Sequence, residues 1–308
     1  MVTLGLDTSN YTTSTALYNN QTGIATQRRV LLPVSYGEKG LRQSDAVFHH
    51  VKQLPALLEE LLEGGELLSA VGVSVRPRDV KGSYMPCFLS GEMAARSIGA
   101  AGRIPVLSFS HQAGHLAAAL YGAGELRLMK EIFLAFHASG GTTECLLVSP
   151  GKEHPFEVEI LGKTLDLAVG QVIDRVGVML GLGFPAGIEL EKLAARAEKP
   201  PRFKPVLKDG DCCLSGLENQ CAALLEKGRP PCEIAAFCQS AVGETLLAMA
   251  KLAAEKYPGI PFVFAGGVMS NAFIRERIAA EIKGAVFAPA SLSADNAAGV
   301  AVLAAGRA

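Results

Sequence analysis

Residues 2–18 read VTLGLDTSNYTTSTALY, which is the pattern of a β-strand, a small polar turn and a returning strand. The apolar, β-prone start from Val2 to Leu6 favours a buried strand, and the hydroxyl-rich run from Thr8 to Thr13 favours a turn. We expect Gly23 to Leu32 to add a third strand. Small hydroxyl side chains in a turn suit a phosphate ligand, although an ordinary polar turn accounts for them equally well.

The same plan returns at residues 132–148, which read IFLAFHASGGTTECLLV, and Phe156 to Leu161 again supplies a third strand. The turn from Ala138 to Thr143 thus corresponds to the turn from Thr8 to Thr13. An internal duplication of a strand–turn–strand unit is a signal at the level of the fold. It predicts two related lobes, each offering a glycine- or hydroxyl-rich turn to the same phosphate-bearing ligand.

The segment between the two repeats predicts a helix, a strand, a second helix and a second strand. Their expected bounds are Ser44–Leu62, Ala70–Val75, Cys87–Ala100 and Ile104–Phe109. Pro55 lies inside the first helix and allows a kink or a break there. A strand, loop, helix and strand in series predict a parallel crossover, whose functional loops lie beyond the carboxyl ends of the strands. The basic loop at residues 76–83 occupies such a place, and phosphate binding and simple solvation are both open for it.

Two histidines follow the last of these strands, in the sequence Ser110-His111-Gln112-Ala113-Gly114-His115. Their spacing of four residues places both imidazoles on one face of a helix, one turn apart. Both rings can therefore reach one divalent metal ion, and a third ligand has to come from elsewhere in the chain. The pair is not a zincin protease motif, because that motif needs a glutamate where Gln112 stands.

Glycine-rich turns precede several of the later helices. The turn at residues 181–187 ends at Gly187, and Gly266-Gly267 follows a buried strand at residues 261–265. Such turns allow a ligand to approach the backbone and the amino end of a helix. Short loops before helices also need glycine for steric reasons alone. Asp295 precedes a terminal helix at residues 297–305, where the local pattern indicates an ordinary N-cap.

Composition limits the classes of protein. The chain has 308 residues, 49% of them hydrophobic, and a net charge of -1, so a global field does not attract nucleic acid. The sequence contains no apolar stretch of about 18 residues without charge, so we expect no membrane span. The N-terminus lacks the layout of a signal peptide. We therefore expect a cytoplasmic protein without membrane association. Its seven cysteines contain no C-x-x-C pair and are expected as thiols, mostly buried.

These motifs, in this order, resemble the TsaD family of tRNA threonylcarbamoyladenosine transferases through almost the whole chain. The matching segments are residues 4–9, 110–115, 139–141, 170–174, 180–187, 214–217, 264–268 with Asn271, and 295–296. The resemblance implies an α/β fold of two duplicated ribonuclease-H-like lobes of the actin-like ATPase type, with the ligand site in the interlobe cleft. We expect an N-terminal lobe at 1–108, a C-terminal lobe with the metal and nucleotide motifs at 109–296, and a terminal helix at 297–308 that packs back on the N-terminal lobe.

The resemblance also assigns roles to residues. It implies that His111, His115 and Asp295 bind one divalent metal, Fe²⁺ or Zn²⁺. It also implies which residues bind ATP or threonylcarbamoyl-AMP and which take part in catalysis. The substrate-binding residues are Ser9, Ser139, Gly140, Gly141, Thr142, Asp174, Gly187, Gly266, Gly267 and Asn271, and the catalytic candidates are Tyr11 and Thr12.

The implied reaction moves the threonylcarbamoyl group of threonylcarbamoyl-AMP to N6 of the adenosine beside the tRNA anticodon. The implied partners are tRNA and a homologous subunit or a second copy of the chain. The family usually reads Glu-Thr-Ser-Cys-Asp-Glu-Thr in its first turn, whereas here Tyr11 and Thr12 replace the two acids. Two alternatives therefore remain open: a carbamoyl-type transferase with another acceptor, and a non-catalytic nucleotide-binding partner subunit.

Overall fold

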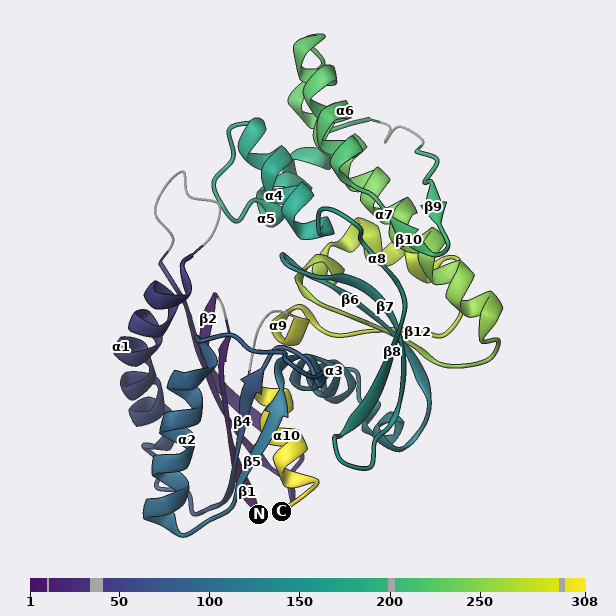
Figure 1. Cartoon of the computed structure of the whole chain (residues 1–308). Coiled ribbons are helices and arrows are strands. Elements are labelled where there is room, and N and C mark those ends of the chain that lie inside the picture. The colour runs from purple at the N-terminus through teal and green to yellow at the C-terminus, as the bar shows by residue number, and fades with distance from the viewer. Residues whose placement is uncertain (10, 34–40, 199–202, 294–296) are drawn as a thin grey trace. The chain divides into compact units, whose positions relative to one another are not determined.

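A computed structural model describes residues 1–9, 11–33, 41–198, 203–293 and 297–308 (Figure 1). The chain divides into two compact units. Unit 1 is Met1–Met129 with Pro150–Glu157 and the described part of Ala294–Ala308, and unit 2 is Lys130–Ser149 with Val158–Ser293. The histidine helix thus belongs to unit 1, so the expected boundary at residue 108 moves to residue 129. The reason is local, because this helix packs against the C-terminal helix of the same unit.

Unit 1 is built on a five-stranded sheet in the order β3-β2-β1-β4-β5. β1 pairs antiparallel with β2 and parallel with β4. Helices α1 and α2 cover one face of this sheet, and α3 and α10 cover the other (Figure 1). The bounds are β1 Val2–Ser9, β2 Thr12–Asn19, β3 Ile24–Leu31, α1 Gln43–Leu62, β4 Leu68–Arg76, α2 Phe88–Gly102, β5 Val106–Ser110, α3 His111–Gly122, η1 Leu126–Lys130 and α10 Ala298–Ala305. α1 continues through Pro55 without a break.

Unit 2 repeats this order, with a sheet that reads β8-β7-β6-β11-β12. Its first strand again pairs antiparallel with the second and parallel with the fourth, which confirms the predicted duplication. The bounds are β6 Phe133–Ala138, β7 Thr143–Pro150, β8 Phe156–Lys163, α4 Val169–Met179, α5 Gly187–Ala194, β9 Leu207–Lys208, β10 Asp211–Cys212, α6 Ser215–Glu226, α7 Pro231–Lys256, β11 Phe262–Ala265, η2 Gly267–Ser270, α8 Ala272–Ala279, β12 Ala285–Phe287 and α9 Ala290–Ser293.

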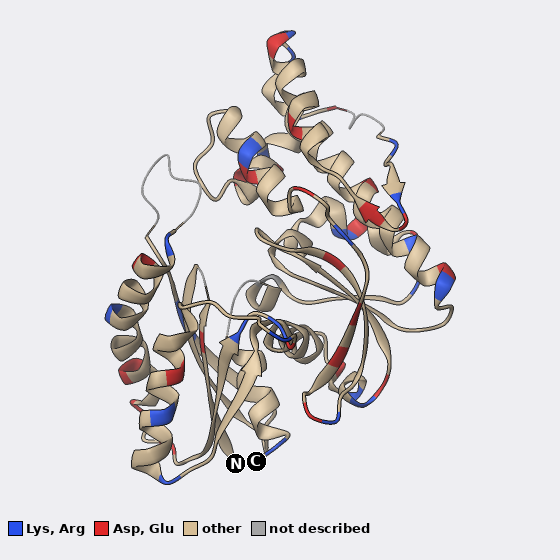
Figure 2. Ribbon diagram, in the orientation of Figure 1, with Lys and Arg blue, Asp and Glu red and all other residues tan. Residues whose placement is uncertain are grey.

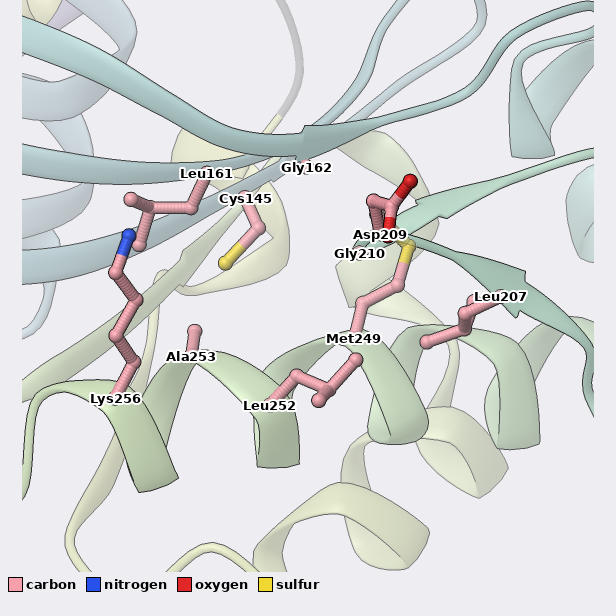
Figure 3. Close-up of a pocket in the computed structure, with 10 residues that line it drawn as sticks. All are labelled: Cys145, Leu161, Gly162, Leu207, Asp209, Gly210, Met249, Leu252, Ala253 and Lys256. Atoms are coloured by element: carbon pink, nitrogen blue, oxygen red, sulfur yellow. The ribbon is translucent and has the colours of Figure 1, made fainter.

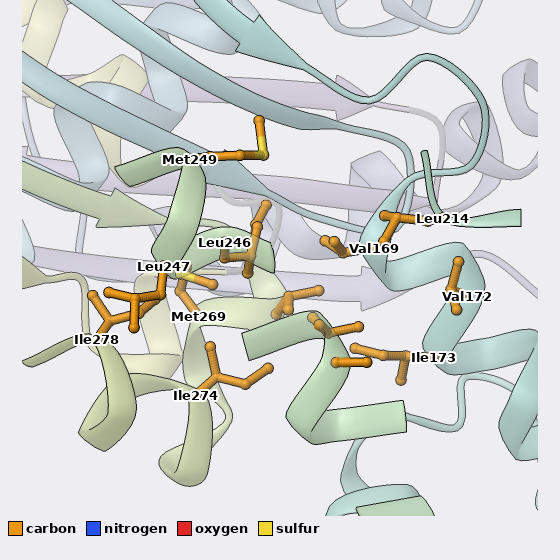
Figure 4. Close-up of a cluster of buried hydrophobic side chains, with 14 of the residues drawn as sticks. Val169, Val172, Ile173, Leu214, Leu246, Leu247, Met249, Met269, Ile274 and Ile278 are labelled. Atoms are coloured by element: carbon orange, nitrogen blue, oxygen red, sulfur yellow. The ribbon is translucent and has the colours of Figure 1, made fainter. Parts of the chain in front are cut away.

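The core of unit 2 gathers around α7, the longest of the described helices, which is apolar on most of its surface. Leu246 and Met249 of α7 meet Val169 of α4 and Ile274 of α8 in one cluster of buried side chains (Figure 4). Full burial of such a side chain contributes about 1.5–3 kcal/mol. The cluster therefore fixes α4, which carries the predicted residue Asp174, and α8, which follows the predicted residue Asn271.

Unit 1 packs its central helices at backbone distance, and glycine makes this possible. A Cβ atom on Gly299 of α10 would lie 1.9 Å from the carbonyl oxygen of Gly114 in α3. A Cβ atom on Gly5 of β1 would lie 2.4 Å from the carbonyl oxygen of Ala297. The hydroxyl of Thr3 donates to the carbonyl of Ala301 at 2.8 Å. The C-terminal helix thereby holds α3 and the central strand of unit 1 in one rigid packing.

Both charge signs are spread over the two units (Figure 2). None of the described helices is long and apolar enough to cross a membrane.

All seven cysteines are thiols, and five of them are buried, as the sequence predicts. Burial raises the pKa of the Cys145 thiol to about 12, so that thiol stays protonated at neutral pH.

Candidate functional site

The two histidines begin α3, and the sequence around them fixes where that helix starts. Ser110 is the N-cap, and its hydroxyl accepts a hydrogen bond from the backbone N–H of Ala113 at 3.2 Å. His111 and His115 then point the same way from the first two turns. Their Nε2 atoms lie 2.9 Å apart, and the ring centroids lie 4.3 Å apart.

This separation fits two ligands of one metal ion. Metal–nitrogen bonds of about 2.0–2.1 Å with angles between 90° and the tetrahedral value place two nitrogens about 2.9–3.4 Å apart. Asp295, the expected third ligand, lies outside the described residues. Among the described residues no group of three or more His, Cys, Asp and Glu side chains is arranged to hold a metal ion. The histidine pair is therefore the part of the predicted metal site that the structure describes.

A carboxylate that was not predicted as a site residue contacts this pair. Asp7, near the end of β1, accepts a hydrogen bond from Nδ1 of His111 at 2.7 Å on its Oδ2 atom. Ser74 of β4 donates to the same oxygen at 2.7 Å, and the backbone N–H of Ser9 donates to Oδ1 at 2.9 Å. Asp7 is only 1% exposed. Its place at the end of a buried strand was the signal in the sequence, but nothing local indicated a partner 104 residues away.

The basic loop at residues 76–83 supports the start of α3. Arg76 pairs with Asp79 at 2.6 Å, and Asp79 accepts a hydrogen bond from the Ser110 hydroxyl, also at 2.6 Å. The backbone N–H of Gln112 donates to the carbonyl of Pro77 at 3.0 Å. The guanidinium of Arg76 is thus occupied by an internal carboxylate. This arrangement favours a supporting role for Arg76 over the phosphate-binding alternative.

The first turn places the predicted residues Ser9, Tyr11 and Thr12 around the exit of β1. Ser9 and Thr12 are buried, Tyr11 is half-buried, and Asn10 lies outside the described residues. The Ser9 hydroxyl is buried without a hydrogen-bond partner in the described structure. His50 of α1 lies nearby, with Nδ1 at 2.8 Å from the Thr13 hydroxyl. Burial lowers the pKa of His50 to about 4, so this ring is neutral at physiological pH.

In unit 2, the turn after β6 carries Ser139, Gly140, Gly141 and Thr142. The Ser139 hydroxyl accepts hydrogen bonds from the N–H groups of Gly141 at 3.4 Å and Thr142 at 3.2 Å. A Cβ atom on Gly140 or Gly141 would meet nothing within 4 Å, so the backbone of this turn is open to a ligand. Gly170, at the start of α4, packs against it. A Cβ atom there would lie 2.6 Å from the Ser139 carbonyl oxygen.

The second glycine pair lies beside this turn. Gly266 follows β11 with a φ of 100°, in the region that favours glycine. A Cβ atom on it would lie 2.2 Å from the carbonyl oxygen of Ala138, at the end of β6. β6 and β11 are parallel neighbours, so their carboxyl ends bring the two turns together. The structure thus places Gly266 beside the turn that carries Ser139 to Thr142.

The remaining predicted residues are Asp174 in the middle of α4, Gly187 at the start of α5 and Asn271 at the start of α8. Asp174 of α4 accepts a hydrogen bond from the backbone N–H of Ala186 at 2.7 Å, just before Gly187 begins α5. Burial raises the pKa of Asp174 above its ordinary value, against the opposing effect of this hydrogen bond. Asn271 caps α8 through the N–H of Ile274 at 3.0 Å. The Asn271 side-chain oxygen is therefore used internally, and its amide nitrogen donates to Gln239 at 3.2 Å.

A separate pocket of about 380 Å³ lies between β8, the β9–β10 turn and the end of α7 (Figure 3). Met249 and Leu161 supply apolar walls, and Lys256 and Asp209 carry opposite charges at its ends. None of the residues predicted to bind the nucleotide lines it. It is therefore distinct from the glycine turns described above.

Comparisons with known proteins agree with these motifs. The model of the TsaD family, described as tRNA N6-adenosine threonylcarbamoyltransferase, matches residues 34–302. The protein of that name from Streptococcus gordonii is 33% identical over 312 residues, which covers 96% of this chain and 88% of the relative. The relative from Streptococcus thermophilus is 35% identical over 272 residues, which covers 83% of this chain and 77% of the relative.

Among solved structures, HypF in its phosphate- and nucleotide-bound form gives a TM-score of 0.61 at 14% identity, covering 98% of this chain and 45% of HypF. A glucokinase of the ROK family from Streptomyces griseus gives 0.51 at 14% identity, covering 99% of this chain and all of the glucokinase. These likenesses show the fold alone, which is the two-lobed actin-like ATPase fold that the family resemblance implies.

Proposed function

Because this chain belongs to the TsaD family of tRNA N6-adenosine threonylcarbamoyltransferases, we propose that it transfers a threonylcarbamoyl group from threonylcarbamoyl-AMP to N6 of the adenosine beside the tRNA anticodon. The observation that carries the proposal is the pair of Nε2 atoms of His111 and His115, 2.9 Å apart at the start of α3. Two ring nitrogens at this separation can bind one metal ion.

In the proposed site, His111 and His115 hold a divalent metal, with Asp295 as the third ligand. The metal would supply Lewis acidity toward the threonylcarbamoyl group. The hydroxyl of Ser110 donates to Asp79 and accepts from the backbone N–H of Ala113, and these two hydrogen bonds keep both rings at the start of the helix. Rigid support of this kind reduces the reorganisation that ligand binding would otherwise require.

Unit 2 is proposed to bind the adenylate. Added Cβ atoms at Gly140, Gly141 and Gly267 would meet nothing within 4 Å, so a phosphate can approach the backbone at these three glycines. Backbone N–H donors in such a place stabilise the charge that develops on AMP as it leaves. Asp174, in the middle of α4, accepts a hydrogen bond from Ala186 just before α5, and Asn271 is the N-cap of α8. We propose that these two residues contact the adenosine half.

The first turn of the chain bears on which acceptor receives the transferred group. The first turn carries Tyr11 and Thr12 where the family usually has two acids, so a carboxylate is missing as a base for the adenine N6 proton. This substitution favours one second candidate, a carbamoyl-type transfer from the same nucleotide to a different acceptor. Either reaction uses the same metal and nucleotide residues.

We also propose that the chain works with a homologous subunit or a second copy of itself. Leu89 and Met93 on α2 are 49% and 58% exposed, as apolar side chains of a face that a partner can cover. A chain that serves only as the nucleotide-binding member of such a pair would bind the nucleotide without turning it over.

The test uses the purified protein, threonylcarbamoyl-AMP, unmodified tRNA and the companion proteins of the family, with nucleoside mass spectrometry as the readout. We expect threonylcarbamoyladenosine to accumulate with wild-type protein and not with H111A. A second tRNA with guanosine at the target position should remain unmodified. A different result would be consumption of threonylcarbamoyl-AMP while tRNA stays unmodified and an added small-molecule acceptor gains mass. That result would show that the acceptor is the small molecule and would contradict transfer to tRNA.

A further inference from the structure

We infer that Asp7 is the positioning residue of the metal site: its carboxylate orients the ring of His111 and fixes which nitrogen faces the metal. The inference rests on the proposed metal site, which it deepens. Asp7 does not contact the proposed ligand position itself, because it reaches His111 from the Nδ1 side of the ring. It acts through that ring.

The carboxylate is held in place before it meets the histidine. Ser74 reaches Oδ2 from the neighbouring strand β4 at 2.7 Å, and the backbone N–H of Ser9 reaches Oδ1 at 2.9 Å. Asp7 is 1% exposed, so water does not compete for these contacts. The Ser74 hydroxyl and the Ser9 N–H both donate to this side chain, an arrangement that suits Asp7 as the acceptor toward His111 as well.

An acceptor at this point determines the state of His111. With Asp7 as the acceptor, the hydrogen between Asp7 and His111 belongs to Nδ1 of the histidine. In the neutral ring Nε2 is then an unprotonated nitrogen, and it is Nε2 that lies 2.9 Å from Nε2 of His115. A carboxylate behind a metal-ligating histidine commonly fixes its tautomer and orientation, and its loss typically lowers metal affinity 10–100-fold.

Asparagine at position 7 cannot reproduce this arrangement. The three donors occupy both oxygen positions, so the NH₂ group of an asparagine would face either the Ser9 N–H or the pair formed by Ser74 and His111. One donor would then oppose another. The remaining amide oxygen would be a neutral and weaker acceptor.

The experiment measures the affinity for Zn²⁺ by competition with a chromophoric chelator, and the absorption spectrum with Co²⁺, without any substrate. We expect D7N to bind Zn²⁺ 10–100-fold more weakly than wild type. In the H111A background, D7N should cause no further loss, because Asp7 acts through the ring that is then absent. D166N is the control: Asp166 in unit 2 is likewise held by several donors, among them three backbone N–H groups, and its replacement should leave the Zn²⁺ affinity unchanged.

The outcomes separate this inference from the proposed function. Wild-type protein that binds no Zn²⁺ would overturn the metal site itself. If wild-type protein binds Zn²⁺, two results would overturn the role of Asp7. One is a D7N variant with the same Zn²⁺ affinity as wild type, and the other is an equal loss of affinity from D7N in the wild-type and H111A backgrounds. If D7N does not fold, S74A carries the test, since it removes one donor that orients Asp7. It should weaken Zn²⁺ binding in the wild-type background and leave it unchanged in H111A.

Discussion

Replacing Gly299 by alanine tests whether α10 holds the histidine helix at backbone distance. The new Cβ atom would lie 1.9 Å from the Gly114 carbonyl oxygen and 2.6 Å from the backbone nitrogen of Ala118. Real Cβ contacts stay beyond 3.0 Å, so α10 and α3 must separate by about 1 Å or more. Overpacking of this kind costs about 1–3 kcal/mol, and contact with two backbone atoms indicates the upper end. Alanine recovers about 1 kcal/mol of helix propensity, which leaves a net loss of about 2 kcal/mol.

The assay is thermal unfolding, in which this loss corresponds to a decrease in Tm of about 3 °C for a chain of 308 residues. The matched control is G243A in α7, where the added Cβ would meet Ile274 at 3.6 Å, an ordinary contact. G243A should therefore gain up to about 1 kcal/mol. G299A should also weaken Zn²⁺ binding, because α3 carries both histidines. A G299A protein as stable as wild type would refute the packing described for unit 1.

Two further predictions concern His50 and Gly170. Because the pKa of His50 falls from 6.5 to about 4 in the folded state, the unfolded chain binds more protons between these values, and stability decreases as the pH falls through them. Between about pH 7.5 and pH 5, wild type should lose about 2 kcal/mol more than H50N, which keeps a donor for Thr13 but cannot titrate; equal losses in urea unfolding would contradict the burial of a neutral ring. G170A should bind ATP about tenfold more weakly than wild type, because its Cβ would displace Gly140, whereas G243A should bind ATP normally; equal affinity of G170A would contradict the phosphate role of that turn.

The sequence predicted what local periodicity and duplication encode. The two strand–turn–strand units, their parallel crossovers and the glycine turn at Gly266 follow from patterns within a few residues, and the repeated order of both sheets confirms them. The spacing of His111 and His115 likewise predicts their common helix face, because helix geometry alone determines it.

Contacts between distant segments could not be predicted in this way. Nothing near Asp7 indicates His111, since the pairing of β1 with β4 and the crossover to α3 bring them together. Gly299 reads as an ordinary glycine in an apolar helix until the backbone of Gly114 is seen beside it. The boundary of unit 1 lies at residue 129 and not at residue 108 for the same reason, because α3 packs against α10, the last helix of the chain.

The most direct test of the central claim is metal-dependent transfer from threonylcarbamoyl-AMP labelled at the carbonyl carbon. The protein is stripped with a chelator, divided, and one half is reloaded with Fe²⁺ or Zn²⁺ before both are given tRNA and the companion proteins. We predict label in the adenosine beside the anticodon only with reloaded protein, and none with H111A under the same reloading. Equal labelling by stripped, reloaded and H111A protein would contradict a metal site at His111 and His115, and no labelling in any sample would contradict the transfer to tRNA.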